Sequence, residues 1–158
     1  MRLKVRLGIE KFGWRFYLAI HRLKPVKGMN SILPSGKHIL MWDFDSITEE
    51  AVVDALIKVQ DEFHLPRIWL LNTGLPNYWH AFRFKLTPWA DLVHILAATE
   101  GLDRVYFAIG IVRGYFTLRY SRKKGRQFEP AIIIPGYGDE DIDPFDFKSF
   151  ITYKSARK

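Results

Sequence analysis

Asp43 and Asp45 stand two positions apart at the end of the apolar run 38–42, and two acids at this spacing can hold a metal ion. Side chains alternate between the two faces of a strand, so both carboxylates would lie on one face, with the flanking apolar side chains on the other. Two carboxylates this close repel each other unless positive charge lies between them. The pair therefore indicates a site for Mg²⁺ or Mn²⁺, which prefer oxygen ligands and often act on phosphates. The alternative is a strand end at which the chain leaves the core.

His80 is the next candidate, because Thr73 and Gly74 begin a turn just before the strand that carries it. Exposed backbone amides in such a turn can hold a phosphate, and a histidine at its exit can donate to a phosphate oxygen. Alternation places Arg83 and Lys85 of the same strand on the face away from His80, toward the predicted helices. The alternative interpretation of His80 is a half-buried histidine beside aromatic residues.

Asp103 is a third candidate acid, at the junction between a predicted helix and the next predicted strand. Its alternative role is that of a capping or turn residue. Thr117, Arg119 and Ser121 then share one face of a later predicted strand. Guanidinium and hydroxyl groups in such a row suit a triphosphate or a nucleic-acid backbone. The alternative is a basic edge strand that discourages pairing with other strands.

Positive charge is concentrated in one segment of the chain. The 158 residues include 24 Lys and Arg against 17 Asp and Glu, for a net charge of +7. This balance favours a polyanionic partner, most simply nucleic acid. Segment 113–126 carries basic residues and no acid, whereas 139–146 is acidic. The uneven distribution favours a binding surface over a basic surface kept only for solubility.

The composition also excludes several classes of site. The chain has no cysteine, so it has neither disulfides nor metal sites held by thiolates. No apolar run has the length of a signal-peptide core or of a membrane span. We therefore expect a cytoplasmic protein without membrane contact.

The elements that must position the candidate residues follow from the apolar spacing and the capping signals. Ser46 and Glu49 form a capping-box pattern, and Thr87 with Pro88 is typical of a second helix start. The predicted elements are, in order, strand 38–45, helix 47–64, strands 67–73 and 78–85, helix 88–100, and strands 105–112 and 115–121. The order strand, helix, strand, strand, helix, strand is ferredoxin-like, and it places both helices on one face of the sheet.

We expect a single compact domain of the α+β class over residues 1–158. Its RRM-like (ferredoxin-like βαββαβ) core would span 37–123, with accessory strands in 1–36 and a C-terminal extension in 124–158. The N-terminal part would contain a hairpin of strands 2–9 and 14–23 and a loop over 25–36, and 131–134 would be a further short strand. The hairpin and the last strands would cover the free face of the sheet and leave a cleft between two sheets.

The order of these pieces resembles the archaeo-eukaryotic primase superfamily, which includes primase–polymerases of archaeal plasmids and viruses. In that family an RRM-like unit lies under a second, N-terminal sheet unit, and the resemblance covers about residues 37–123. The matches are Asp43 and Asp45 to the acidic pair, His80 to the motif histidine, Asp103 to the third acid, and Arg119 and Ser121 to the strand near the nucleotide phosphates.

The resemblance implies a metal-dependent nucleotidyltransferase of nucleic-acid replication. Such an enzyme joins nucleoside triphosphates on a single-stranded DNA or RNA template with Mg²⁺ or Mn²⁺, and a helicase or accessory primase subunit is a further implied partner. The metal ligands would be Asp43, Asp45 and Asp103; the triphosphate would be bound by Thr73, His80, Arg119, Ser121 and Lys123; and the template would be guided by Arg113, Arg122, Lys124 and Arg126.

Other functions stay open at the level of sequence. A non-catalytic module, either a degenerate primase-like domain or an RRM-like sheet, would bind single strands through aromatic residues such as Tyr78, Phe82 and Phe84. A metal-dependent nuclease would use the same acids. An acidic pair on the binding face would repel phosphate unless a metal ion lies there, which favours an enzyme over the binding module.

Overall fold

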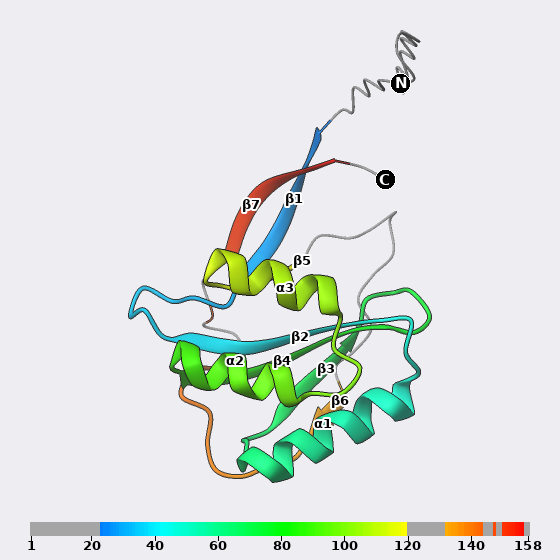
Figure 1. The fold of residues 1–158 in the computed structure, drawn as a ribbon, viewed down its shortest axis with the longest axis vertical. Coiled ribbons are helices and arrows are strands. Elements are labelled where there is room, and N and C mark those ends of the chain that lie inside the picture. Colours follow the sequence, from blue (N-terminus) through cyan, green and yellow to red (C-terminus); the bar gives the residue numbers. More distant parts are fainter. Residues whose placement is uncertain (1–22, 120–131, 144–146, 148–149, 157–158) are drawn as a thin grey trace, which may run out of the picture.

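The computed structural model describes residues 23–119, 132–143, 147 and 150–156. Within them the protein is an α+β fold of three helices and two antiparallel sheets, so the α+β part of the predicted fold class is confirmed. The elements are β1 Leu23–Asn30, β2 His38–Asp45, α1 Glu49–Phe63, β3 Ile68–Asn72, β4 Tyr78–Thr87, α2 Trp89–Ala98, α3 Arg104–Arg113, β5 Thr117–Arg119, β6 Ile132–Ile134 and β7 Phe150–Ala156 (Figure 1). The predicted hairpin over 2–23 lies almost wholly outside the described residues.

The larger sheet has the strand order β2-β4-β3-β6, and α1 and α2 cover one of its faces (Figure 1). Leu40, Trp42 and Phe44 of β2 point into the core under these helices, where Leu56 of α1 and Leu96 of α2 are fully buried. The alternation predicted for β2 is therefore confirmed. It leaves Asp43 on the opposite face.

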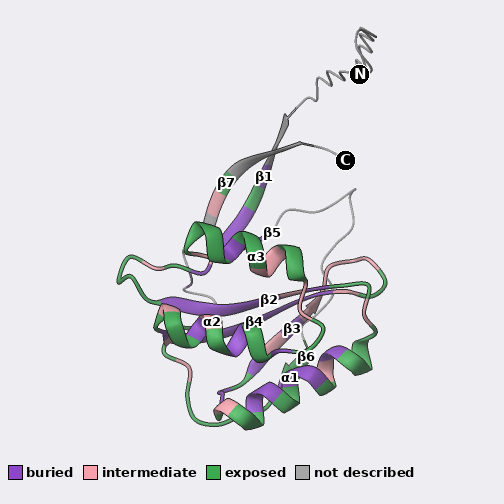
Figure 2. Cartoon of the chain, in the orientation of Figure 1, coloured by how far each residue is buried: buried purple, intermediate pink, exposed green. Residues whose placement is uncertain are grey.

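That opposite face is also packed over most of its length. Ile39 and Met41 of β2 and Phe82 and Phe84 of β4 form a second apolar cluster, which Phe147 completes. Residues of β1 and β5 also belong to this cluster. Both strands come from the smaller sheet, which has the strand order β5-β1-β7. Figure 2 shows the buried residues along β2 and β4. The face is thus covered, but by β1 and β5 together with Phe147, and these fill the expected cleft beside the phenylalanines; the hairpin expected to cover it lies almost wholly outside the described residues.

Residues 105–112 form most of helix α3, so the predicted strand there is wrong. The side chain of Asp103 caps the helix by accepting from the Tyr106 amide, and Gly114, with a φ of +75°, ends it by donating to the Gly110 carbonyl. These two caps stabilise a helix although several residues between them are β-branched. The sixth element of the predicted βαββαβ order is consequently a helix.

Three further boundaries differ from the predictions. The loop expected over 25–36 begins later, because β1 continues to Asn30 through pairing with β7, a distant strand that the sequence did not indicate. Thr48, not Ser46, caps α1, and its hydroxyl accepts from the Ala51 amide. Thr87 ends β4, so Pro88 occupies the cap position of α2.

Candidate functional site

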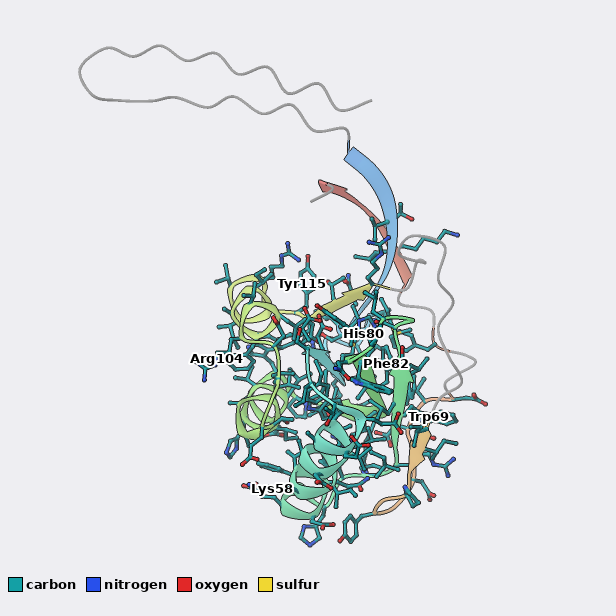
Figure 3. All side chains as sticks on the ribbon, turned by 90° about the vertical axis from the view of Figure 1, so that its right-hand side faces the viewer. Lys58, Trp69, His80, Phe82, Arg104 and Tyr115 are labelled. Atoms are coloured by element: carbon teal, nitrogen blue, oxygen red, sulfur yellow. The ribbon has the colours of Figure 1, made fainter. Side chains whose placement is uncertain are left out.

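Asp43 and His80 lie side by side on the sheet face opposite α1 and α2. They are register partners on β2 and β4, and His80 Nε2 lies 3.4 Å from Asp43 Oδ1. His80 is 8% exposed, whereas the side chain of Asp43 is 27% exposed. Figure 3 shows His80 and Phe82 on the strand side of the molecule, away from the helices. The pair is a close contact between an imidazole nitrogen and a carboxylate oxygen beside solvent.

Asp45 is the last residue of β2, and Thr73 directly follows the last residue of β3. Asp45 is exposed and is the register partner of Tyr78, whose carbonyl oxygen accepts from the Thr73 amide at 3.0 Å. Gly74 has a φ of +77°, and its amide donates to Asn72 Oδ1 at 2.7 Å. Because the Gly74 amide is used within the turn, the expected phosphate cradle does not have that donor.

Asp103 reaches Asp43 through the backbone. The Asp103 amide donates to the Asp43 carbonyl oxygen at 2.9 Å, which fixes the start of α3 against the edge of β2. The Asp103 carboxylate caps α3, the role that was the alternative interpretation of this residue. Capping uses one acceptor position of a carboxylate that has about four. Asp103 therefore combines a structural role with a place beside Asp43.

A cavity of about 260 Å³ is lined by two of the candidate acids, Asp43 and Asp103, and by the basic residue Arg113. We call it the Asp43 cavity; it lies between β2, α3 and the start of β5. Its wall is formed by Asp43, Asp103, Val105, Tyr106, Ile109, Gly110, Arg113, Tyr115 and Thr117. Two of these residues are candidate acids, Arg113 is a candidate template-binding arginine, and the other side chains of the wall include aromatic and aliphatic groups.

Tyr106 connects the cavity to the sheet. Its hydroxyl donates to the Met41 carbonyl oxygen at 2.8 Å. Desolvation and then the charge of Asp43 raise the pKa of Tyr106 well above its usual value, so the phenol stays protonated and continues to donate. The sequence did not identify Tyr106, because a strand over 105–112 would have oriented it differently. The cap pair formed by Asp103 and Gly114 is the signal that would have placed it on a helix.

The structure places only part of the basic segment. Arg113 is exposed in the last turn of α3 and lines the Asp43 cavity. Arg119 is partly exposed on β5, opposite Gly28 of β1, and shares a strand face with Thr117, whose hydroxyl donates to Asn30 Oδ1 at 2.7 Å. The remaining predicted site residues of this segment lie outside the described residues: Ser121, Arg122, Lys123, Lys124 and Arg126.

The three candidate acids have the oxygen ligands that a divalent cation prefers, but their arrangement meets only part of its requirements. Within the described residues, no three His, Asp or Glu side chains lie close enough together to form a metal-binding group, so Asp43, Asp45 and Asp103 do not form one. Mg²⁺, however, usually keeps several waters and is held by one or two carboxylates together with substrate phosphates. Asp43 and Asp45, two oxygen donors on one strand face, fit that smaller requirement.

Comparison with known proteins identified no relative of this chain. No protein family, no curated protein and no solved structure matches this chain. None of the helices in the described ranges is long and apolar enough to cross a membrane.

Proposed function

We propose that the protein is a metal-dependent nucleotidyltransferase of nucleic-acid replication, similar to a primase or primase–polymerase. It would join nucleoside triphosphates on a single-stranded template. The observation that carries the proposal is the contact of Asp43 with His80 at the edge of a cavity that also holds Asp103 and Arg113. Asp43, Asp103 and Arg113 were selected from the sequence for separate reasons and line one cavity, and His80 contacts Asp43 from the neighbouring strand.

An RRM-like core is part of the same proposal. The order β2, α1, β3, β4, α2 with both helices on one sheet face supports a ferredoxin-like arrangement in which α3 takes the place of the last strand. The resemblance to the archaeo-eukaryotic primases covers this same segment. In that arrangement the catalytic acids lie on the face that the helices leave free, where Asp43 is found.

In the proposed reaction each residue has a defined task. Asp43 and Asp45 would hold Mg²⁺ or Mn²⁺, which when bound stabilises charge on the phosphates. Arg113, an always-charged guanidinium at the cavity wall, would bind phosphate oxygens, and His80 would donate to them from the sheet face. Tyr106 would hold the β2 edge in place through its bond to the Met41 carbonyl.

The RRM-like binding module is less well supported, because its stacking residues are covered. Phe82 and Phe84 are 8% and 6% exposed. They stack on each other with ring centres 6.2 Å apart, and Phe147 packs edge-on against Phe84. Bases need exposed aromatic faces to stack on such a sheet. This observation favours a function that depends on Asp43 and Asp45 at the end of this face. A nuclease would use the same two acids.

Calorimetric titration of a nucleoside triphosphate with and without Mn²⁺ tests the proposal. We expect binding that needs Mn²⁺ in the wild type and is lost in Asp43→Asn/Asp45→Asn. The matched control is Asp54→Asn, which removes an exposed acid from α1 and should bind as the wild type does. Binding that is equally tight without Mn²⁺ and in the double variant would contradict the proposal. If the triphosphate binds as expected, primer extension against strand cleavage then separates a transferase from a nuclease.

A further inference from the structure

A second cavity, of about 320 Å³, lies between the end of α1 and the start of α2. We call it the Arg83 cavity. Its polar wall is formed by Arg83, Thr87, Asp91 and His94, beside Pro88 and the ring of Phe63. Arg83 is the register partner of Leu40, on the helix-covered face of the sheet. The cavity therefore opens on the other side of the sheet from His80, and it shares no wall residue with the Asp43 cavity.

Arg83 is a buried cation whose hydrogen-bonding capacity is incompletely used. The residue is 6% exposed, and its Nη1 donates to Thr87 Oγ1 at 3.3 Å. Its Nε is the one buried side-chain nitrogen or oxygen in the described part of the chain that has no hydrogen-bond partner. Leaving a donor of a charged group buried and unpaired is costly, so a missing acceptor is indicated beside it.

The charge of Arg83 persists at physiological pH. Desolvation lowers the pKa of Arg83 to about 10, and the nearby negative charge of Asp141 opposes that change. Asp141 itself is exposed, and one of its carboxylate oxygens accepts from the Leu86 amide. The guanidinium therefore stays cationic near neutrality, beside the charge of Asp141.

The start of α2 supplies a second set of donors at the same place. Pro88 is the cap residue of this ten-residue helix, and the helix start has no side-chain cap hydrogen bond within the described residues. The first N–H groups of a helix have no partner within the helix and form the positive end of its dipole. The hydroxyl of Thr87 is already used, because it donates to the Lys85 carbonyl and accepts from Arg83. The start of α2 and the unpaired Nε of Arg83 therefore lie at the same cavity.

We propose that the Arg83 cavity binds a small oxyanion, a phosphate or carboxylate group, with the Arg83 guanidinium as its principal donor and the start of α2 as its second. Such groups bind well at helix N-termini and to arginine. Asp91, exposed on the same wall, opposes an anion by its own charge, and His94 three residues further on is the nearest side chain on α2 that can offset it. The site is independent of the proposed transferase activity.

Calorimetric titration with inorganic phosphate and with acetate, at constant ionic strength, tests the proposal. We expect saturable binding to the wild type that weakens about tenfold or more in Arg83→Met, because hydrogen bonds from a charged donor are lost. Asp91→Asn should bind severalfold more tightly, because it removes a negative charge from the wall. Arg104→Met, which removes an exposed arginine that lines neither cavity, should bind as the wild type does.

The two anions and a second pair of variants keep the outcomes separate. Tighter binding of phosphate would assign the site to a phosphorylated ligand, and tighter binding of acetate would assign it to a carboxylate. If Arg83→Met does not fold, as judged by circular dichroism, Asp91→Asn and Arg83→Lys carry the test, with Arg83→Lys expected to bind more weakly than the wild type. The absence of saturable binding to the wild type, or unchanged binding in a folded Arg83 variant, would overturn the proposal.

Discussion

The Asp43 cavity and the Arg83 cavity hold charge in opposite situations. In the Asp43 cavity the acids are already engaged by the protein, Asp43 with His80 at 3.4 Å and Asp103 with the start of α3. In the Arg83 cavity the central cation has a buried nitrogen without an acceptor. The first cavity is therefore organised before any ligand arrives, whereas the second is completed only by a ligand.

The two cavities also differ in the solvent exposure of their central charged side chains. The side chain of Asp43 is 27% exposed, and Arg83 is 6% exposed. Water screens the charge of a partly exposed acid, whereas a buried cation is surrounded by weakly polarisable protein. Loss of Asp43 should thus affect function far more than stability. Loss of Arg83 should affect ligand binding while folding tolerates it.

The largest effect is expected from Asp43→Asn on nucleotide incorporation. The substitution keeps the shape of the side chain but removes the charge that would hold Mg²⁺ or Mn²⁺, so incorporation should fall by about a hundredfold or more. Primer extension measures this loss, and fluorescence anisotropy with a labelled single strand should show nearly unchanged template binding. Arg83→Met should retain wild-type incorporation. Equal activity in Asp43→Asn would remove the Asp43 cavity from the proposed catalytic site.

Gly110→Ala should be the most destabilising of the changes to the walls of the Asp43 cavity. An added Cβ would overlap the ring of Phe116, which is 1% exposed and cannot move into solvent. We expect a loss of about 1–3 kcal/mol in the free energy of unfolding, as for other overpacked sites. Urea unfolding followed by circular dichroism measures it. The penalty should shrink in a Phe116→Leu background, and an equal penalty there would show that this contact is not its cause.

Helix α3, which carries Gly110, also shows where sequence reasoning fails. Its residues alternate well enough to suit a strand, and only the cap pair at Asp103 and Gly114 favours a helix. The pairing of β1 with β7 was not predictable either, because it joins segments more than a hundred residues apart whose local patterns are weak. Such contacts become visible only when the packing of the whole chain is known.

The strands that carry the candidate residues were more predictable, because alternation along a half-buried strand is strict. It placed Asp43 and His80 on one face of the sheet and Arg83 on the other, and the structure has them so. Alternation cannot show whether a side chain finds a partner. The contact between Asp43 and His80, the missing acceptor at Arg83 and the role of Tyr106 all depend on distances across the fold.

Tyr106→Phe should cost about 1 kcal/mol at pH 8, because the Met41 carbonyl loses its donor. The pKa of Tyr106 is raised in the folded protein, so above pH 10 the unfolded chain loses this proton first and stability falls as pH rises. The contribution is complete below pH 10 and is lost as the pH rises toward the folded pKa. Urea unfolding of wild type and variant at pH 8 and pH 10.5 should show a smaller difference at the higher pH. A constant difference would contradict the shifted phenol.

The smallest effect on stability is expected from Arg83→Met in buffer without phosphate or carboxylate. Methionine keeps much of the apolar stem but removes a buried charge whose Nε has no acceptor, so the free energy of unfolding should stay the same or rise by about 1 kcal/mol. Thermal unfolding measures it, with Arg104→Met as the exposed control. Added phosphate should then raise the Tm of the wild type and of Arg104→Met but leave that of Arg83→Met unchanged. A loss of more than about 2 kcal/mol without any anion would mean that the chain itself satisfies the guanidinium, and the contrast between the two cavities would disappear.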